Sequence, residues 1–151
     1  MATKYAQPEE LEFSCRGALQ GLGADEAALV DRFFDPGSRV LDVGCGAGRE
    51  AIALAKRGLR VTAIDVQPAM IEQARLEAAR AGVTVTFVVQ SVTAFGASPN
   101  SFAHVLFSPL VYAYIPSHAR RIDTLARLRA ALRGGGTIVF SAYNRKAIPS
   151  G

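Results

Sequence analysis

Five short apolar runs alternate along this chain with stretches of helical period. Runs of β-branched residues bounded by Gly, Pro and Ser predict strands, whereas apolar residues that recur every three or four positions predict helices. Alternation of the two is typical of βαβ units, so the sequence predicts an α/β protein with a mainly parallel sheet. The expected strands are Arg39–Val43, Arg60–Asp65, Val83–Val89, Phe102–Phe107 and Thr137–Ala142.

Helical patterns separate most of these strands, and each ends at a glycine, which suits a left-handed helix end. The expected helices are Ala47–Arg57, Pro68–Ala81 and His118–Arg133, the last with Ile122, Leu125, Leu128 and Leu132 inward and a stop at Gly134. Two more are expected before the first strand, at Pro8–Leu19 and Asp25–Phe34. With 151 residues and 50% hydrophobic content, we expect a single domain over residues 1–151, with N-terminal helices in 1–37 and a βα core in 38–151.

Composition disfavours several classes of protein. The first residues lack the apolar core of a signal peptide and no stretch reaches about 18 apolar residues, so we expect a cytoplasmic protein without membrane contact. Two cysteines and two histidines, all far apart, predict no metal site. Residues 1–77 hold 9 Lys/Arg against 12 Asp/Glu, whereas residues 78–151 hold 8 against 1. Because no aromatic residues are interleaved with the arginines of this half, five of which lie in one expected helix, a solvated helix face explains the charge better than binding of nucleic acid or of an acidic substrate does.

The strongest motif is a buried strand that runs into a glycine loop and then a helix, Val40-Leu41-Asp42-Val43-Gly44-Cys45-Gly46-Ala47-Gly48-Arg49-Glu50. Glycines let the backbone turn sharply and let a ligand approach it closely. Asp65 follows about 20 residues later, at the end of the next strand, where a carboxylate can accept both ribose hydroxyls of a nucleoside. Loop and acid together predict a nucleoside site.

Position 49 helps to decide which nucleoside derivative fits. The dinucleotide fingerprint G-x-G-x-x-G requires glycine or another small residue there, but this chain has Arg49. Asp42, just upstream of the glycines, would repel a pyrophosphate, although it can hold an ammonium group directly or through water. The site therefore favours a nucleoside with a zwitterionic amino-acid arm over a dinucleotide.

At these residues the chain resembles the class I S-adenosylmethionine (SAM)-dependent methyltransferases, specifically the small bacterial type whose first motif reads like LDxGCGxGREAxxLAxRG. The resemblance covers Val40 to Tyr143. It implies a Rossmann-like three-layer sandwich with a sheet of about five strands in the order 3-2-1-4-5. It also implies SAM as the cofactor, S-adenosylhomocysteine (SAH) as the product, and in-line methyl transfer to a nucleophile.

The resemblance also implies which residues contact the cofactor. Residues of the first motif would surround the methionine moiety, Asp65 would bind the ribose, and Ser108 would begin the loop that faces the methyl group. Residues after the second and third strands would lie at the adenine. The full set is Asp42, Gly44, Cys45, Gly46, Gly48, Asp65, Val66, Met70, Gln90, Ser91, Val92 and Ser108.

This chain departs from the family pattern at three short motifs and in its length. Gln90-Ser91 replaces the common Gly-Asp at the adenine, Phe102-Ala103 replaces Phe-Asp, and Gly134-Gly135-Gly136 replaces Pro-Gly-Gly. The family's last pair of strands has no counterpart in the 151 residues. If nothing follows Gly151, the fifth strand becomes a bare edge, which tends to recruit another strand, so self-association, a partner chain or a truncated product is expected.

The segment Ser108–Ser117 lies in a stretch, between Arg80 and Arg120, that contains no Asp, Glu, Lys or Arg. We interpret it as a loop that either lines an apolar substrate pocket or packs on the sheet. Its Tyr112 and Tyr114, with the nearby His118, are the candidates for orienting an acceptor, but no catalytic residue is assigned.

Two hypotheses for function follow, with a third resting on the shared fold alone. The leading one is methyl transfer from SAM to a small-molecule acceptor. The alternative is a non-catalytic or incomplete SAM-binding module that needs a partner chain. A nicotinamide-dependent oxidoreductase is disfavoured by Asp42 and Arg49.

Overall fold

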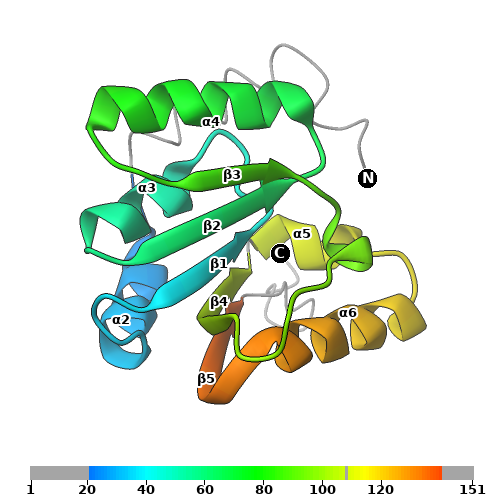
Figure 1. The fold of residues 1–151 in the computed structure, drawn as a ribbon. Coiled ribbons are helices and arrows are strands. Elements are labelled where there is room, and N and C mark those ends of the chain that lie inside the picture. The colour runs from blue at the N-terminus through cyan, green and yellow to red at the C-terminus, as the bar shows by residue number, and fades with distance from the viewer. Residues whose placement is uncertain (1–20, 108, 141–151) are drawn as a thin grey trace, which may run out of the picture.

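A computed structural model describes residues 21–107 and 109–140 of the chain and shows a sheet between two layers of helices (Figure 1). The elements in chain order are α2 (Ala24–Phe33), β1 (Arg39–Val43), α3 (Arg49–Lys56), β2 (Arg60–Asp65), α4 (Pro68–Ala81), β3 (Thr86–Val89), η2 (Val92–Ala94), β4 (Phe102–Phe107), α5 (Pro109–Tyr114), α6 (His118–Ala131) and β5 (Leu132–Phe140). The predicted helix Pro8–Leu19 and the expected end of the fifth strand at 141–142 lie outside the described residues.

The sheet is parallel throughout, in the order β3-β2-β1-β4-β5, which confirms the predicted fold class and strand order. Helices α2, α3 and α4 cover one face, where Val30, Leu54 and Ile71 pack on Val40 and Ala63. Helices α5 and α6 cover the other face. Because every strand runs the same way, the carboxyl ends of all five meet at one edge of the sheet.

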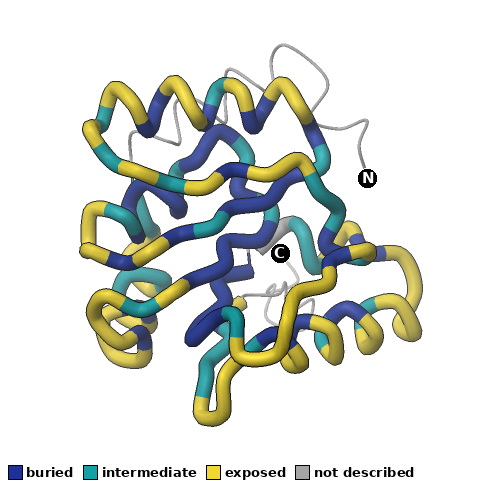
Figure 2. Tube along the Cα trace, in the orientation of Figure 1, coloured by how far each residue is buried: buried dark blue, intermediate teal, exposed yellow. Residues whose placement is uncertain are grey.

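The central strands are the most deeply buried part of the molecule (Figure 2). All six residues of β4 are buried, and so are four of the five residues of β1. A strand buried on both faces must be apolar nearly throughout, which explains why β4 contains no Asp, Glu, Lys or Arg. Among the described residues, no helix is long and apolar enough to span a membrane.

The glycine run Gly134–Gly136 does not end a helix, so that prediction was wrong. Helix α6 ends at Ala131, and β5 begins at Leu132, which pairs with Phe102, while the next paired residue of β4, His104, faces Thr137. The glycines fill this shift in register. A Cβ atom at Gly136 would lie 2.6 Å from the carbonyl oxygen of Ala103, so only glycine allows the strands to approach this closely.

The segment 108–117 is not the continuous loop that we expected, because residues 109–114 form the helix α5. The helix begins at a proline, a residue suited to the first helical position, and Ile115 just beyond it is fully buried against the sheet. This buried anchor holds the helix over the carboxyl ends of the strands. A proline followed by an apolar pair at 111 and 115 was the sequence signal that we missed.

Two further predictions were wrong in detail. Strand β3 begins at Thr86 rather than Val83, because the amide of Val83 completes the end of α4 by donating to Ala78 O at 3.1 Å. Ile122, expected to face inward from α6, is 55% exposed, and Thr124 is buried in its place. Both differences arise from tertiary packing, which the periodicity of apolar residues cannot predict.

Candidate cofactor site

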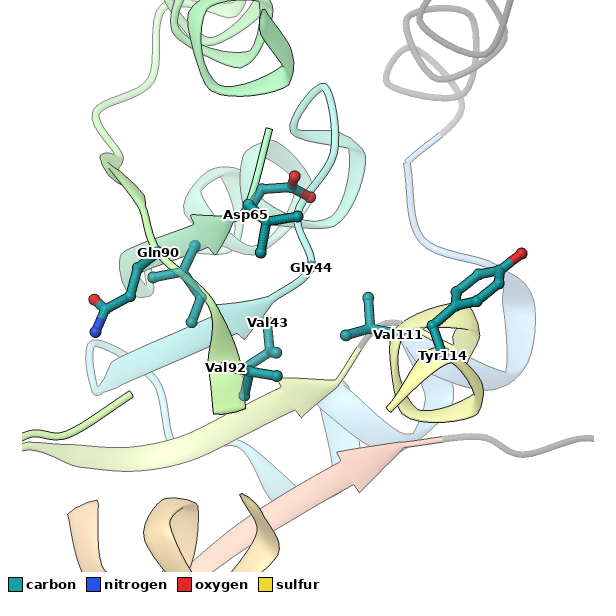
Figure 3. Close-up of a pocket in the computed structure, with 9 residues that line it drawn as sticks. Val43, Gly44, Asp65, Gln90, Val92, Val111 and Tyr114 are labelled. Carbon is teal, nitrogen blue, oxygen red and sulfur yellow. The ribbon is translucent and has the colours of Figure 1, made fainter. Parts of the chain in front are cut away.

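A cavity opens at the carboxyl ends of β1, β2 and β3, beneath α5. Figure 3 shows Gly44 near its centre, with Asp65 and Gln90 on the side of β2 and β3 and with Val111 and Tyr114 on α5 opposite. Five of the twelve residues expected to contact the cofactor line this cavity: Gly44, Asp65, Val66, Gln90 and Val92. Sequence reasoning missed its apolar wall, formed by Val43, Ile64 and Val111.

The glycine loop owes its shape to backbone conformations that favour glycine. Gly44, Gly46 and Gly48 have φ angles of 74°, 52° and 97°, all in the left-handed region. The amides of Gly44 and Cys45 both donate to Ile64 O, at 2.9 and 3.0 Å, which folds the loop across the end of β2. A Cβ atom at Gly48 would lie 3.3 Å from the side chains of Ala74 and Ile52, so α3 and α4 also approach closely here.

Asp65 connects the loop to the second strand. One carboxylate oxygen accepts the Gly46 amide at 3.0 Å, and the other accepts the Gln67 amide at 2.9 Å. Burial raises the pKa of Asp65, although hydrogen bonds from the backbone of Gln67, Gly46 and Val66 act in the opposite direction. A carboxylate oxygen has two acceptor positions, so each oxygen can still accept a ligand hydroxyl. Asp65 thus holds the loop and keeps free acceptor positions that the hydroxyls of a ribose can occupy.

Asp42 lies on the same face of the sheet as Asp65. Its side chain projects from the same face of β1 as that of Val40, two residues earlier, and Asp42 pairs in register with Ala63 of β2. Val40 and Ala63 both pack in the core beneath α3 and α4. The Asp42 side chain is fully buried, and neither of its carboxyl oxygens has a hydrogen-bond partner among the described residues. Burial, and then the charges of Glu50, Glu26 and Asp65, raise its pKa well above the usual range, with Arg49 opposing them.

An orphaned buried carboxyl group is costly, and natural proteins seldom keep one without a reason. A ligand ammonium group would supply the missing hydrogen bonds and a compensating charge. The residues present therefore fit the amino-acid arm of SAM at this point. Asp42 does not line the cavity at α5, however, and the charges of Glu26, Glu50 and Arg49, which act on it, belong to α2 and α3.

A second cavity, of about 410 Å³, lies on that side of the loop, within the size range of ligand pockets. Its walls come from the start of α2, the first residue of α3 and the ends of β4 and β5: Gly23, Ala24, Asp25, Glu26, Leu29, Arg49, Leu106, Phe107, Val139 and Phe140. Val43 in the first cavity pairs in register with Phe107 in the second. The two cavities thus lie on either side of the neighbouring ends of β1 and β4.

Three further predicted residues, Cys45, Met70 and Ser91, line neither cavity. Cys45 and Met70 are buried, and burial raises the pKa of the Cys45 thiol well above its ordinary value. Ser91 caps the short helix η2 through a hydrogen bond from the Thr93 amide. Ser108 lies outside the described residues. Among those residues, no group of three or more Cys, His, Asp and Glu could hold a metal ion.

The three candidate acceptor-orienting residues have different surroundings. Tyr114 lines the first cavity, whereas Tyr112 packs against Phe107 and Phe140 with ring centroids 6.0 and 5.1 Å apart. His118 is exposed at the start of α6 and lines neither cavity. Their chemical roles stay predictions.

Comparison with known proteins identifies the family. Residues 40–136 match the model of the methyltransferase domain family. A ubiquinone biosynthesis O-methyltransferase from Xanthomonas campestris pv. campestris is 41% identical over 114 residues, which cover 73% of this chain and 45% of that protein. The corresponding Xylella fastidiosa protein is 36% identical over 109 residues, or 72% of this chain and 43% of its own length.

A solved structure agrees with these relatives. A TehB-like SAM-dependent methyltransferase from Corynebacterium glutamicum is 26% identical, with a TM-score of 0.71 over 89% of this chain and 73% of that one. The chain belongs to the methyltransferase domain family, in the SAM-dependent class, and SAM is the cofactor that this family uses. It spans slightly less than half the length of the curated relatives described above.

Proposed function

We propose that this chain binds SAM across the glycine loop and transfers its methyl group to a small-molecule acceptor. One observation carries the proposal: Asp65, which is hydrogen-bonded, and the fully buried Asp42, which has no hydrogen-bond partner among the described residues, share one face of the sheet, one after and one before the loop in the chain. A nucleoside end and an ammonium end of one ligand would satisfy both acids. SAM has both ends, and its sulfonium supplies an electrophilic methyl group.

In this proposal the chain itself binds, orients and excludes water. Asp65 accepts the ribose hydroxyls, the side chains of Val66 and Val92 contact the adenine, and the Gln90 amide provides hydrogen bonds where the family has a carboxylate. Val111 and Tyr114 of α5 line the site on the side opposite Asp65 and Gln90 (Figure 3). Because the cofactor supplies the reactivity, orientation and desolvation are the main contributions required of the protein.

The class of acceptor is the finer part of the proposal. The relatives' names describe O-methylation in ubiquinone biosynthesis, and the second cavity is apolar where it meets β4 and β5, with Leu106, Phe107 and Val139. Together these observations support a hydroxyl-bearing apolar or aromatic small molecule. Tyr112, packed against Phe107, is in a position to shape this wall.

Isothermal titration with SAM and with SAH tests the cofactor site. We expect binding of both, and we expect Asp65→Ala to weaken it by about 1–3 kcal/mol, the scale for losing a hydrogen bond to a charged group. Asp31→Ala is the matched control, because this exposed aspartate pairs with Arg57, the residue after α3, and neither of the two lines a cavity described above. Absence of binding to either ligand, or equal affinities for Asp65→Ala and the wild type, would contradict the proposal.

Turnover is measured separately, with methyl-labelled SAM and a panel of phenols and catechols. Methyl transfer to any of them would support the enzyme. Tight SAM binding without turnover, together with a stable complex with a second chain, would favour the alternative of a non-catalytic SAM-binding module. That alternative draws support from Gln90-Ser91 in place of the family's Gly-Asp and from the position of β5 at the sheet edge.

Self-association through β5 stays a prediction, which sedimentation at high micromolar concentration can test. A clean monomer there would contradict it. The cytoplasmic location and the absence of nucleic-acid binding also stay predictions.

A further inference from the structure

The arginine that follows the glycine loop has no role in the function proposed above. Arg49 is the first residue of α3 and lines the second cavity, with a side chain that is 31% exposed. Its position puts the guanidinium beside the amino end of a helix, where backbone amides also attract negative charge. Both features favour an anion, although neither alone defines a binding site.

Arg49 is held from two helices by two carboxylates of different accessibility. Glu50 of α3 has a side chain only 5% exposed and accepts hydrogen bonds from Nε, at 3.0 Å, and from Nη2. Glu26 of α2 is 17% exposed and accepts a longer contact from the same Nη2, at 3.3 Å. Nη1 makes no hydrogen bond within the described part of the chain. Glu50 thus orients the guanidinium, whereas a ligand carboxylate can compete with Glu26 for Nη2.

The second observation that points to a ligand is Asp42. Its fully buried, unpartnered carboxyl group lies close enough to Arg49, Glu50 and Glu26 for all three charges to act on it. Asp65 is the fourth charged group that faces it, and among these neighbours Arg49 is the only cation. An α-amino acid presents an ammonium and a carboxylate on one carbon atom, so it requires an acid and a base close together. Asp42 and Arg49 are such a pair.

We propose that Arg49 binds the α-carboxylate of the cofactor's amino-acid arm, displacing Glu26 of α2, while Glu50 keeps the guanidinium oriented. The inference rests on the proposed function, because it assumes that SAM is bound with its ammonium at Asp42. Binding would exchange one carboxylate partner of Arg49 for another. Helix α2 would then be released from Arg49 when the cofactor arm enters the side of the second cavity that α2 and α3 form, next to the wall of β4 and β5.

The test compares two ligands that differ only in this carboxylate. SAM and decarboxylated SAM are titrated into the wild type and into Arg49→Gln. We expect Arg49→Gln to weaken SAM binding on the order of 10- to 100-fold, the scale for losing a charge-assisted hydrogen bond. Binding of decarboxylated SAM should change by less than about 2-fold, within the spread of a neutral substitution. Because each variant is its own reference, partial loss of folded protein does not change the ratio of the two affinities.

Three further variants sharpen the result. Arg57, the residue just after α3, contacts Asp31 and the Ala53 carbonyl within the described part of the chain, so Arg57→Gln should change neither affinity. Glu26→Gln removes the competing charge, and we expect SAM to bind a few-fold more tightly, about 2- to 5-fold for one partly exposed ion pair. Arg49→Lys should recover only part of the loss, because an ammonium cannot contact Glu50 and a carboxylate with the same planar geometry.

The outcomes separate this inference from the proposed function. If Arg49→Gln weakens both ligands equally, Arg49 acts by holding α2 and α3, and the inference is overturned. If it weakens neither, the carboxylate binds elsewhere, and the inference is again overturned while SAM binding stands. If the wild type binds neither ligand, the proposed function fails together with the inference.

Discussion

The two halves of the sheet's carboxyl edge are built in different ways. At β1 and β2, main-chain groups make most of the contacts: Asp65 holds the amides of Gly46 and Gln67, and Ile64 O receives two more amides from the loop. At β4 and β5, aromatic side chains define the surface, with Phe107, Tyr112 and Phe140 in mutual contact.

The proposed function assigns the first half to the cofactor and the second half to the acceptor, and the difference in construction fits that proposal. A backbone-built site depends on loop geometry more than on side-chain identity, so it can bind one cofactor in proteins of many sequences. A surface of side chains can be changed by substitution without disturbing the loop. We therefore expect perturbations in the first half to abolish folding or cofactor binding, and those in the second half to alter acceptor selection.

The largest effect is expected at the glycine loop. Gly48→Val forces a β-branched residue to φ 97° and places a side chain against Ala74 and Ile52, at a combined cost of about 3 kcal/mol or more. Gly58→Val is the matched control, because Gly58 has φ 82° but a Cβ atom there would meet nothing within 4 Å. Urea unfolding measures both. Equal losses of stability would show that close packing at the loop adds nothing beyond backbone strain.

A smaller effect is expected at Phe140, in the second half. The ring is 42% exposed and contacts Phe107 and Tyr112, so Phe140→Ala should cost only about 1 kcal/mol of stability. Its affinity for SAH should equal that of the wild type, while KM for an accepted phenol should rise. The KM of Phe140→Leu, which keeps an apolar side chain, should lie between those of the wild type and Phe140→Ala. A weakened SAH affinity would contradict the division between the halves.

The buried acid of the first half predicts a pH dependence. Because the pKa of Asp42 is raised in the folded protein, the native state holds a proton that the unfolded chain releases above about pH 4. Stability should therefore fall as the pH rises from there toward the folded-state pKa. Asp42→Asn should remove this slope and raise the melting temperature of the ligand-free protein at pH 7 by roughly 2–4 °C, about 1 kcal/mol.

The measurement is thermal melting of both proteins between about pH 4 and pH 8, with and without SAM. The same Asp42→Asn variant should bind SAM more weakly, because it loses the charge that pairs with the ammonium. A variant that is stabilised and also binds SAM normally would remove Asp42 from the site.

The smallest effect is expected at His104 in β4, where the pH dependence of stability should have the opposite sign to that of Asp42. The ring is buried, stacks on Phe34 and accepts the Asp35 amide at Nε2, at 3.0 Å. Burial lowers the pKa of His104, with Asp35 partly opposing this, so below about pH 6.5 the unfolded chain takes up a proton that the native state resists. Stability should fall slightly as the pH decreases, by less than about 1 kcal/mol.

His104→Gln, which keeps an acceptor for the Asp35 amide, should flatten this acid-side slope. Urea unfolding of the wild type, His104→Gln and Asp42→Asn between about pH 5 and pH 7.5 separates the two opposing contributions. A slope unchanged in His104→Gln would show that His104 has the same pKa in both states.

Much of the fold was predictable because its signals are local. The bounds of β1, β2, β4 and α4 agree with the predicted segments, since each is a strongly patterned run between clear turn residues. The glycine loop and Asp65 were predictable for the same reason: a strand, a sharp turn and an acid at the next strand end constrain one another along the sequence. Wrong predictions occurred where one sequence pattern fits two structures, as with Gly134–Gly136 and residues 109–114.

The sequence by itself determined the alternation of strands and helices, the cofactor loop and the acid that follows it, because these depend on residues close together in the chain. Only the tertiary structure decided which charges surround that loop. Glu26, Asp42, Arg49 and Glu50 come from three elements, and only packing of α2 and α3 on β1 brings them together. Packing also left the Asp42 carboxyl group without a partner among the described residues, because a buried strand cannot supply hydrogen bonds to its own side chains.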